Sequence, residues 1–260
     1  MAPPGAHVDA SGRPADSAGQ AWAGKRIPSS GFGQDTGAAD PRLAAALRAT
    51  AAAATPESET ELLRRVAAAR WLVPVVAIPT ETDTSGTSVV DTRSDMAAVT
   101  LTAPDGSRAL PMFSSTDSLA EWDPSARPVP VRAATAAQAA ITEQCQALLV
   151  DVASAEATVL RPSMVWALAQ ERTWLPAHLD GHVDAAVAAA VRDEADVTAY
   201  RLEAGTPAGA GVLRVVLTLT AGLPRDAVAG VATRIGERLA TDGETRARVD
   251  ALTFALEAAR

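Results

Sequence analysis

Large apolar residues are sparse at the start of the chain and recur in short, regular runs afterwards. Residues 1–38 are rich in Gly, Pro, Ser, Ala and Asp, and such a segment cannot bury enough apolar surface to offset the entropy lost on ordering. We therefore predict a disordered tail over 1–38. Trp22, Ile27 and Phe32 are large apolar residues within it. They are interpreted as anchors that pack on the folded domain or, alternatively, as a short motif for a partner.

From residue 40 onward, amphipathic stretches alternate with continuous apolar ones. Asp40 followed by Pro41 has the residue types of a helix N-cap and first turn. Residues 55–70 carry acidic residues early and arginines late, which suits the helix macrodipole. The run WLVPVVAI at 71–78 is apolar throughout, as in a strand buried on both faces. Pro74 inside this run predicts an edge position or a bulge.

The clearest local signal is a hairpin around Asp105-Gly106, the residue pair that tight hairpin turns prefer. After it, Ser114 to Asp117 predicts the end of the second strand and the start of a short helix. That helix would present Leu119 and Trp122 on one side, and a short strand would follow at 129–131.

The second half of the chain changes character near residue 197. Before it, a helix, a strand and two further helices are predicted over 134–195. After it come two alternating strand runs, an amphipathic helix and a stretch at 248–256 that fits a strand or a helix, of which we favour the strand. The sequence thus predicts an α+β protein: a mixed β-sheet domain with flanking helices over 40–195, and a smaller ββαβ unit over 197–260.

Composition narrows the classes of partner. The chain has 23 basic and 31 acidic residues, a net charge of -8, which disfavours binding to nucleic acid or to anionic membranes. No apolar stretch is long enough for a membrane span, and the N-terminal residues lack the pattern of a secretory signal, so we expect a cytoplasmic location. The one cysteine, Cys145, excludes a disulfide within the chain and is interpreted as a buried, unreactive thiol.

No familiar catalytic pattern occurs in the sequence. A serine nucleophile at Ser114 or Ser115 would need a histidine base, and beyond the tail only His178 and His182 are available. That histidine pair is interpreted as part of a surface loop and helix cap in preference to a metal site. We therefore predict no catalytic residues, no metal and no cofactor.

Several stretches together resemble the SseB N-terminal domain family in its actinobacterial form. They are WLVPVVA at 71–77, DMAAVTLTAPDGSRALPMFSSTDSLAEWDPSARPVPV at 95–131, ALLVDVA at 147–153 and VLRPSMVWALAQ at 159–170. The tail piece WAGKRIPSSGFGQDTGAADP is similar to what precedes that domain, and the resemblance covers roughly 20–195. It implies an association with enhanced serine sensitivity, the phenotype from which the family is named. It implies no catalytic residues, because the biochemical role of the family is undefined.

Two hypotheses on function remain open. The first is a non-enzymatic cytoplasmic binding or regulatory protein that holds an unknown protein partner or a small ligand. It would use the tail residues Trp22, Ile27 and Phe32, or a rim formed by Phe113, Ser114, Ser115, Trp122, Asp123 and Arg127. The second is a small-molecule-binding protein or enzyme of amino-acid-related metabolism, which the family name alone suggests. The oligomeric state cannot be predicted from these patterns.

Overall fold

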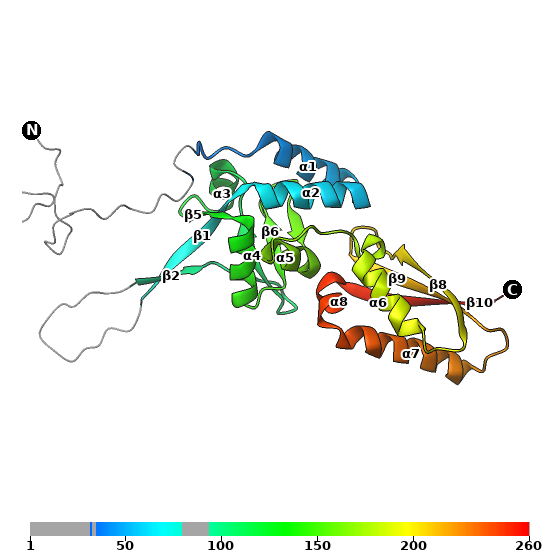
Figure 1. Cartoon of the computed structure of the whole chain (residues 1–260). Coiled ribbons are helices and arrows are strands. Elements are labelled where there is room, and N and C mark those ends of the chain that lie inside the picture. Colours follow the sequence, from blue (N-terminus) through cyan, green and yellow to red (C-terminus); the bar gives the residue numbers. More distant parts are fainter. Residues whose placement is uncertain (1–31, 33–34, 80–93, 260) are drawn as a thin grey trace, which may run out of the picture. The chain divides into compact units, whose positions relative to one another are not determined.

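The structure is a computed structural model that describes residues 32, 35–79 and 94–259 (Figure 1). By its internal contacts the chain divides into Met1–Asp35 and Thr36–Arg260, and the second unit contains all helices and strands described below. The predicted anchors Trp22 and Ile27 lie outside the described residues.

The elements of the first half alternate between helices and short strands. They are α1 (Pro41–Ala52), α2 (Pro56–Ala68), β1 (Arg70–Pro79), β2 (Ser94–Ala98), β3 (Leu101–Thr102), β4 (Arg108–Met112), α3 (Thr116–Trp122), β5 (Arg127–Arg132), α4 (Ala133–Thr142), β6 (Ala147–Val150), β7 (Thr158–Leu160) and α5 (Pro162–Ala169).

The second half begins with a 3₁₀ turn and ends on a strand. Its elements are the turn at Ala177–Leu179, α6 (Gly181–Val191), β8 (Val197–Ala204), β9 (Val212–Leu219), α7 (Arg225–Thr241), α8 (Gly243–Arg248) and β10 (Ala251–Ala258). The stretch left open between helix and strand is therefore a strand.

Three sheets give the α+β architecture that the sequence predicts. The order β2-β1-β5 is antiparallel throughout, whereas β3-β4-β6-β7 is mixed because β4 and β6 run parallel. The third sheet, β10-β9-β8, combines an antiparallel β8–β9 pair with a parallel β9–β10 pair. The predicted hairpin is the antiparallel β3–β4 pair, with Gly106 at φ +83° in its turn.

The first two helices begin where the polar residues predict. The Asp40 carboxylate accepts from the backbone N–H groups of Arg42 and Leu43, which starts α1. Thr55 and Ser58 form a reciprocal capping box at the start of α2. These caps satisfy N–H groups that have no partner within a helix.

The prediction for Pro74 is wrong in one respect. Strand β1 is the central strand of its sheet, not an edge. The proline is tolerated because β1 changes partner there on the edge away from β5: Val75 pairs with Ala98 of β2, whereas Leu72 exchanges both backbone hydrogen bonds with Phe113. A missing N–H at Pro74 therefore interrupts no ladder.

The outer edge of β5 is closed by two prolines. Pro130 lies opposite Leu72, whose N–H and C=O are turned the other way, toward Phe113. The pair is therefore of the non-hydrogen-bonded type, and the nitrogen of Pro130 faces outward, as does that of Pro128 two residues earlier. Proline has no N–H to offer, so two of the outward positions of β5 cannot donate to a further strand.

The buried apolar residues form two large clusters. The first joins α1, α2, α4 and α5 to the strands β1, β4 and β6, with Trp71 and Met112 fully buried. The second lies between β9 and the helices α6 and α7 (Figure 1). Val183 and Val187 of α6 belong to this second cluster. The division into 40–195 and 197–260 stays a prediction, since Thr36–Arg260 forms one unit in which α6 packs with the later strands.

Candidate functional site

Three of the six predicted rim residues are interior. Phe113 is 0% exposed, bridges to Leu72 of β1 and packs with Leu119 of α3. Ser114 and Ser115 are also buried. The hydroxyl of Ser115 accepts from the N–H of Ser118 and so caps α3. The buried residues of this stretch thus stabilise the connection between β4 and α3.

Ser114 is tied to a buried carboxylate that follows β6. Its backbone N–H donates to Oδ1 of Asp151 at 2.8 Å, and its hydroxyl donates to Oδ2 at 2.7 Å. Asp151 itself has φ +46°, a conformation that few residues other than glycine adopt. Both oxygens of the carboxylate are occupied, so the Ser114–Asp151 pair is a closed structural contact.

The other three rim residues lie at the surface end of α3. Trp122 is half-buried, with its ring centroid 5.3 Å from that of Phe113. Asp123 ends α3, and its carboxylate accepts hydrogen bonds from the N–H and the hydroxyl of Ser125. Both hydrogen bonds lower the pKa of Asp123, and the one from the hydroxyl has the larger effect. Arg127 is exposed at the start of β5. Binding of a partner by these residues stays a prediction, as it does for the tail residue Phe32, which is half-buried.

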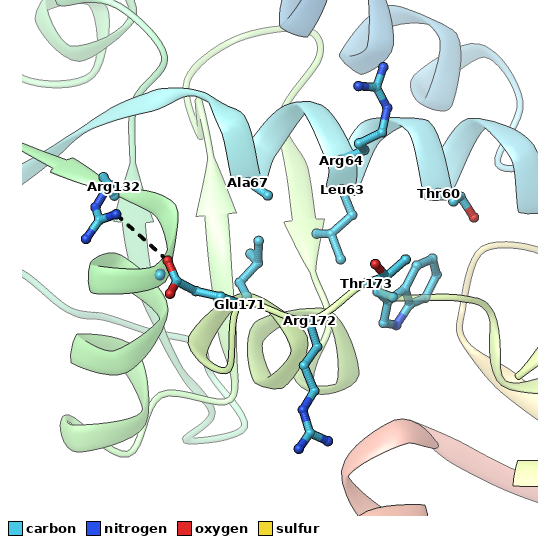
Figure 2. Close-up of a pocket in the computed structure, with 11 residues that line it drawn as sticks. Thr60, Leu63, Arg64, Ala67, Arg132, Glu171, Arg172 and Thr173 are labelled. Atoms are coloured by element: carbon cyan, nitrogen blue, oxygen red, sulfur yellow. Dashed lines mark ion pairs between the residues drawn. The ribbon is translucent and has the colours of Figure 1, made fainter. Parts of the chain in front are cut away.

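A groove elsewhere on the domain gathers residues from four separate segments (Figure 2). Its volume is about 360 Å³, and it lies against α2, the junction of β5 and α4, the end of α5 and the segment after α5. It is lined by Thr60, Leu63, Arg64, Ala67, Arg132, Ala134, Leu168, Glu171, Arg172, Thr173 and Trp174. The side chains of Leu63, Leu168 and Trp174 are apolar and buried, so the floor of the groove is apolar.

An opposed pair of charges lies at one end of the groove. Nη1 of Arg132 and Oε1 of Glu171 are 3.9 Å apart, and the two side chains are 75% and 67% exposed. Figure 2 shows this pair facing each other, with Leu63 of α2 pointing into the same space. A pair this long and this exposed contributes little to stability.

The other two arginines of the lining are engaged elsewhere. Arg64 points away from the groove in Figure 2 and forms two hydrogen bonds with Glu61 one turn earlier on α2. Arg172 also points away; it bonds to Glu244 at 2.7 Å and lies 5.2 Å from the ring of Trp166. Arg132 and Glu171 are therefore the charged groups of this lining that face the groove.

Glu171 is held in an unusual backbone conformation. It follows the end of α5 with φ +52°, while the N–H groups of Glu171 and Arg172 bond to the carbonyls of Leu168 and Ala167. This is the position after a helix at which glycine is usual, because a Cβ atom is strained there. Gln144 occupies the equivalent position after α4, with φ +57°.

The groove was not among the sites predicted from the sequence. Its two facing charges are 39 positions apart and belong to no motif. The sequence predicts a helix over 161–171 that includes Glu171, whereas in the structure α5 ends at Ala169 and Glu171 follows it at φ +52°.

A second group of charges is buried and closed. The Arg161 guanidinium, only 14% exposed, bonds to Glu59 at 2.6 Å and to Asp250 at 3.0 Å. Asp250 also accepts from the N–H and hydroxyl of Ser163, whose oxygen accepts from the indole N–H of Trp174. The Arg161 cluster therefore joins α2, α5 and the residue before β10 through satisfied hydrogen bonds.

The remaining candidates do not form a reactive site. Nε2 of His182 lies 3.5 Å from Asp242, and no group of three His, Cys, Asp or Glu residues suited to a metal occurs in the part of the chain that the structure describes. Cys145 is buried, and burial raises the pKa of its thiol. None of the helices in the described ranges is both long and apolar enough to cross a membrane.

The sequence was compared with models of known protein families, with curated proteins and with solved structures. Residues 43–167 match the model of the SseB protein N-terminal domain. No curated protein and no solved structure matches the chain. The match confirms the resemblance seen in the sequence, and the chain carries an SseB N-terminal domain over residues 43–167. The matched region contains the helices α2 to α4, Arg132 and Arg161.

Proposed function

We propose that this protein is a non-enzymatic binding protein whose ligand is a small zwitterion with an apolar body, such as a free amino acid. The observation that carries the proposal is the exposed Arg132–Glu171 pair at the end of a groove with an apolar floor. The ligand carboxylate would bind the guanidinium, and the ligand ammonium would bind the carboxylate of Glu171.

The chemistry of the two side chains suits this ligand. A guanidinium offers a planar set of donors that matches a carboxylate, and hydrogen bonds between charged groups are the stronger ones in proteins. The apolar part of the ligand would lie on Leu63, Leu168 and Trp174. The volume of about 360 Å³ is at the lower end of the range for small-molecule sites, which favours a metabolite over a protein segment.

Opening the pair for a ligand costs little. The two atoms are 3.9 Å apart and both side chains are largely exposed, so water already solvates them. The Arg161 cluster, by contrast, could accept a ligand only by losing short, buried hydrogen bonds. This difference supports the Arg132–Glu171 groove as the binding site.

The residues that line the groove support binding over catalysis. The hydroxyl groups among them belong to Thr60 and Thr173, and that of Thr60 donates to the carbonyl of Pro56 within α2. A nucleophile needs a base within hydrogen-bond reach, and the described lining contains no histidine or cysteine. An enzyme of amino-acid-related metabolism remains the alternative, and the cytoplasm remains the predicted location.

The experiment that tests the proposal is a calorimetric titration with three related compounds. Leucine carries both charges, N-acetylleucine lacks the ammonium, and leucinamide lacks the carboxylate. Leucine should bind most tightly, and each derivative should bind about 10- to 100-fold more weakly, the expected loss for one charged hydrogen bond.

Matched variants test which side chain of the groove binds each charged group of the ligand. Arg132→Gln should remove the preference for leucine over leucinamide, and Glu171→Gln should remove the preference for leucine over N-acetylleucine. Arg64→Gln is the control, because its guanidinium points away from the groove (Figure 2). Equal binding of the three compounds, or equal effects of all three variants, would contradict the proposal.

A further inference from the structure

The outer edge of β10 differs from the outer edge of β5. In the order β10-β9-β8, strand β10 pairs only with β9 among the described strands, over eight consecutive positions without a register shift. It contains no proline, and its one charged residue, Glu257, is bound to Arg201 at 2.6 Å. Proteins normally guard long edges with prolines, charges or bulges. The edge of β5 is guarded in this way and that of β10 is not.

The backbone of β10 offers hydrogen-bonding groups at defined positions. The N–H of Ala259 donates to Leu219 of β9 at 2.7 Å, so the backbone groups of alternate residues, 251 to 259, face β9. Those of Leu252, Phe254 and Leu256 therefore face outward. The side chains of Leu252 and Leu256 are 37% and 41% exposed, which is unusual for leucines on a regular strand.

These three outward positions form a pattern that is symmetric about Phe254. In an antiparallel pair centred there, Leu252 of one strand lies opposite Leu256 of the other, and Phe254 lies opposite its own copy. Glu257 lies opposite Ala251, so no like charges meet. In this register the residues whose backbone groups face outward lie directly opposite one another. Their N–H and C=O groups can therefore form the hydrogen bonds between the two strands. One strand thus provides both the donors and the apolar side chains that its own copy needs.

We propose that β10 pairs antiparallel with β10 of a second copy of this chain about a two-fold axis at Phe254. The two sheets would join into one continuous sheet, which is the strand-addition mode of recognition. Such an interface uses the same patch on both copies and closes on itself.

A hollow beside β10 would receive an apolar side chain of the second copy. It has a volume of about 250 Å³, and its apolar lining includes Gly236, Leu239, Val249 and Leu252. Leu256 of the second copy lies next to Leu252 in the proposed register and so reaches this hollow. Burial of the exposed leucines provides the apolar part of the association.

Sedimentation of the full chain tests the dimer. At roughly 50 µM, a concentration that populates dimers of micromolar Kd, the wild-type chain should sediment as a dimer. Leu256→Lys should sediment as a monomer, because a lysine on each copy would meet an apolar surface. Leu179→Lys is the matched control, since Leu179 is an exposed leucine far from β10 in sequence. Circular dichroism checks that both variants fold.

A crosslink tests the register. Thr253 lies opposite Ala255 of the second copy in a non-hydrogen-bonded pair, whose Cα atoms are about 4.5 Å apart and within disulfide range. Thr253→Cys combined with Ala255→Cys should give a covalent dimer on mild oxidation, whereas Thr253→Cys alone should not. A wild-type monomer, a dimer that Leu256→Lys leaves intact, or equal crosslinking of the single and double variants would each overturn the proposal.

Discussion

The Arg161 cluster and the Arg132–Glu171 pair are both arginine–carboxylate sites, and they differ chiefly in burial. Arg161 is 14% exposed and bonds to Glu59 and Asp250 at 2.6 and 3.0 Å. Arg132 and Glu171 are largely exposed and 3.9 Å apart. The first site satisfies its own charges and joins three elements, whereas the second leaves donors and acceptors available to a ligand.

The difference teaches that residue type alone does not mark a binding site. A buried charge must be paired, and loss of one partner leaves the other unpaired at high cost. An exposed pair is solvated, contributes little to stability and can exchange water for a ligand. The Ser114–Asp151 pair follows the same rule as the Arg161 cluster, since both oxygens of the buried carboxylate are paired.

The largest expected effect is on the Arg161 cluster. Arg161→Met keeps much of the side-chain volume but leaves Glu59 and Asp250 without their cation, so unfolding should become easier by about 3–5 kcal/mol. Urea denaturation measures the change. Arg132→Gln is the control and should stay within about 0.5 kcal/mol. Similar losses for both variants would remove the distinction between the two sites.

The half-buried Trp122 should matter less than a fully buried ring. Trp122→Ala removes the contact with Phe113 at 5.3 Å and should cost roughly 2–3 kcal/mol, below the range of about 3–5 kcal/mol for fully buried aromatic residues. Chemical denaturation gives the value. A change near zero would return Trp122 to the list of candidate binding residues.

Ser114→Ala tests whether the Ser114–Asp151 pair is structural. The variant leaves Oδ2 of the buried Asp151 without its hydroxyl donor, which should cost about 1–3 kcal/mol. Ligand affinity in the groove should be unchanged, as measured by the leucine titration. If stability stayed constant and affinity fell, the serine would belong to a binding site.

Glu171→Gly should raise stability while it weakens binding. At φ +52° a glycine avoids the strain of a Cβ atom, so the gain should be roughly 0.5–1 kcal/mol. Gln144→Gly is the matched control, since Gln144 has φ +57° after α4 and does not line the groove. It should give a similar gain in thermal unfolding without a loss of leucine binding. Loss of binding in both variants would indicate that the glutamate has no specific role.

Acid should affect a third arginine–carboxylate site. The side chain of Glu194 is 4% exposed, and its hydrogen bonds to Arg234 hold the pKa of Glu194 below its ordinary value of 4.5. This stabilisation is present above pH 4.5 and is lost as the pH falls through the lowered pKa. Unfolding followed from pH 6 to pH 2 should show a smaller acid-dependent loss for Glu194→Gln than for wild type. Parallel curves would assign the acid sensitivity to other carboxylates.

Local patterns were sufficient for most of the secondary structure. The cap at Asp40, the charge order of α2, the Asp105-Gly106 turn and the apolar run of β1 all depend on neighbouring residues, and each lies where the sequence predicts it. Pro74 was misplaced because its tolerance depends on β1 changing partner from β2 to Phe113. That change involves residues more than 20 positions away, which a local pattern does not contain.

The sequence by itself determined the α+β class, the family, the positions of the elements and the absence of a familiar catalytic motif. The class and the elements follow from periodicity, capping and turn chemistry, which act over a few residues, and the family follows from the resemblance of several stretches. Only the tertiary structure decided that Ser114 meets Asp151, that Arg161 is closed by Glu59 and Asp250, and that Arg132 faces Glu171 over an apolar floor. Burial and pairing of charges are set by which distant segments meet, and so the candidate site became visible only in the folded chain.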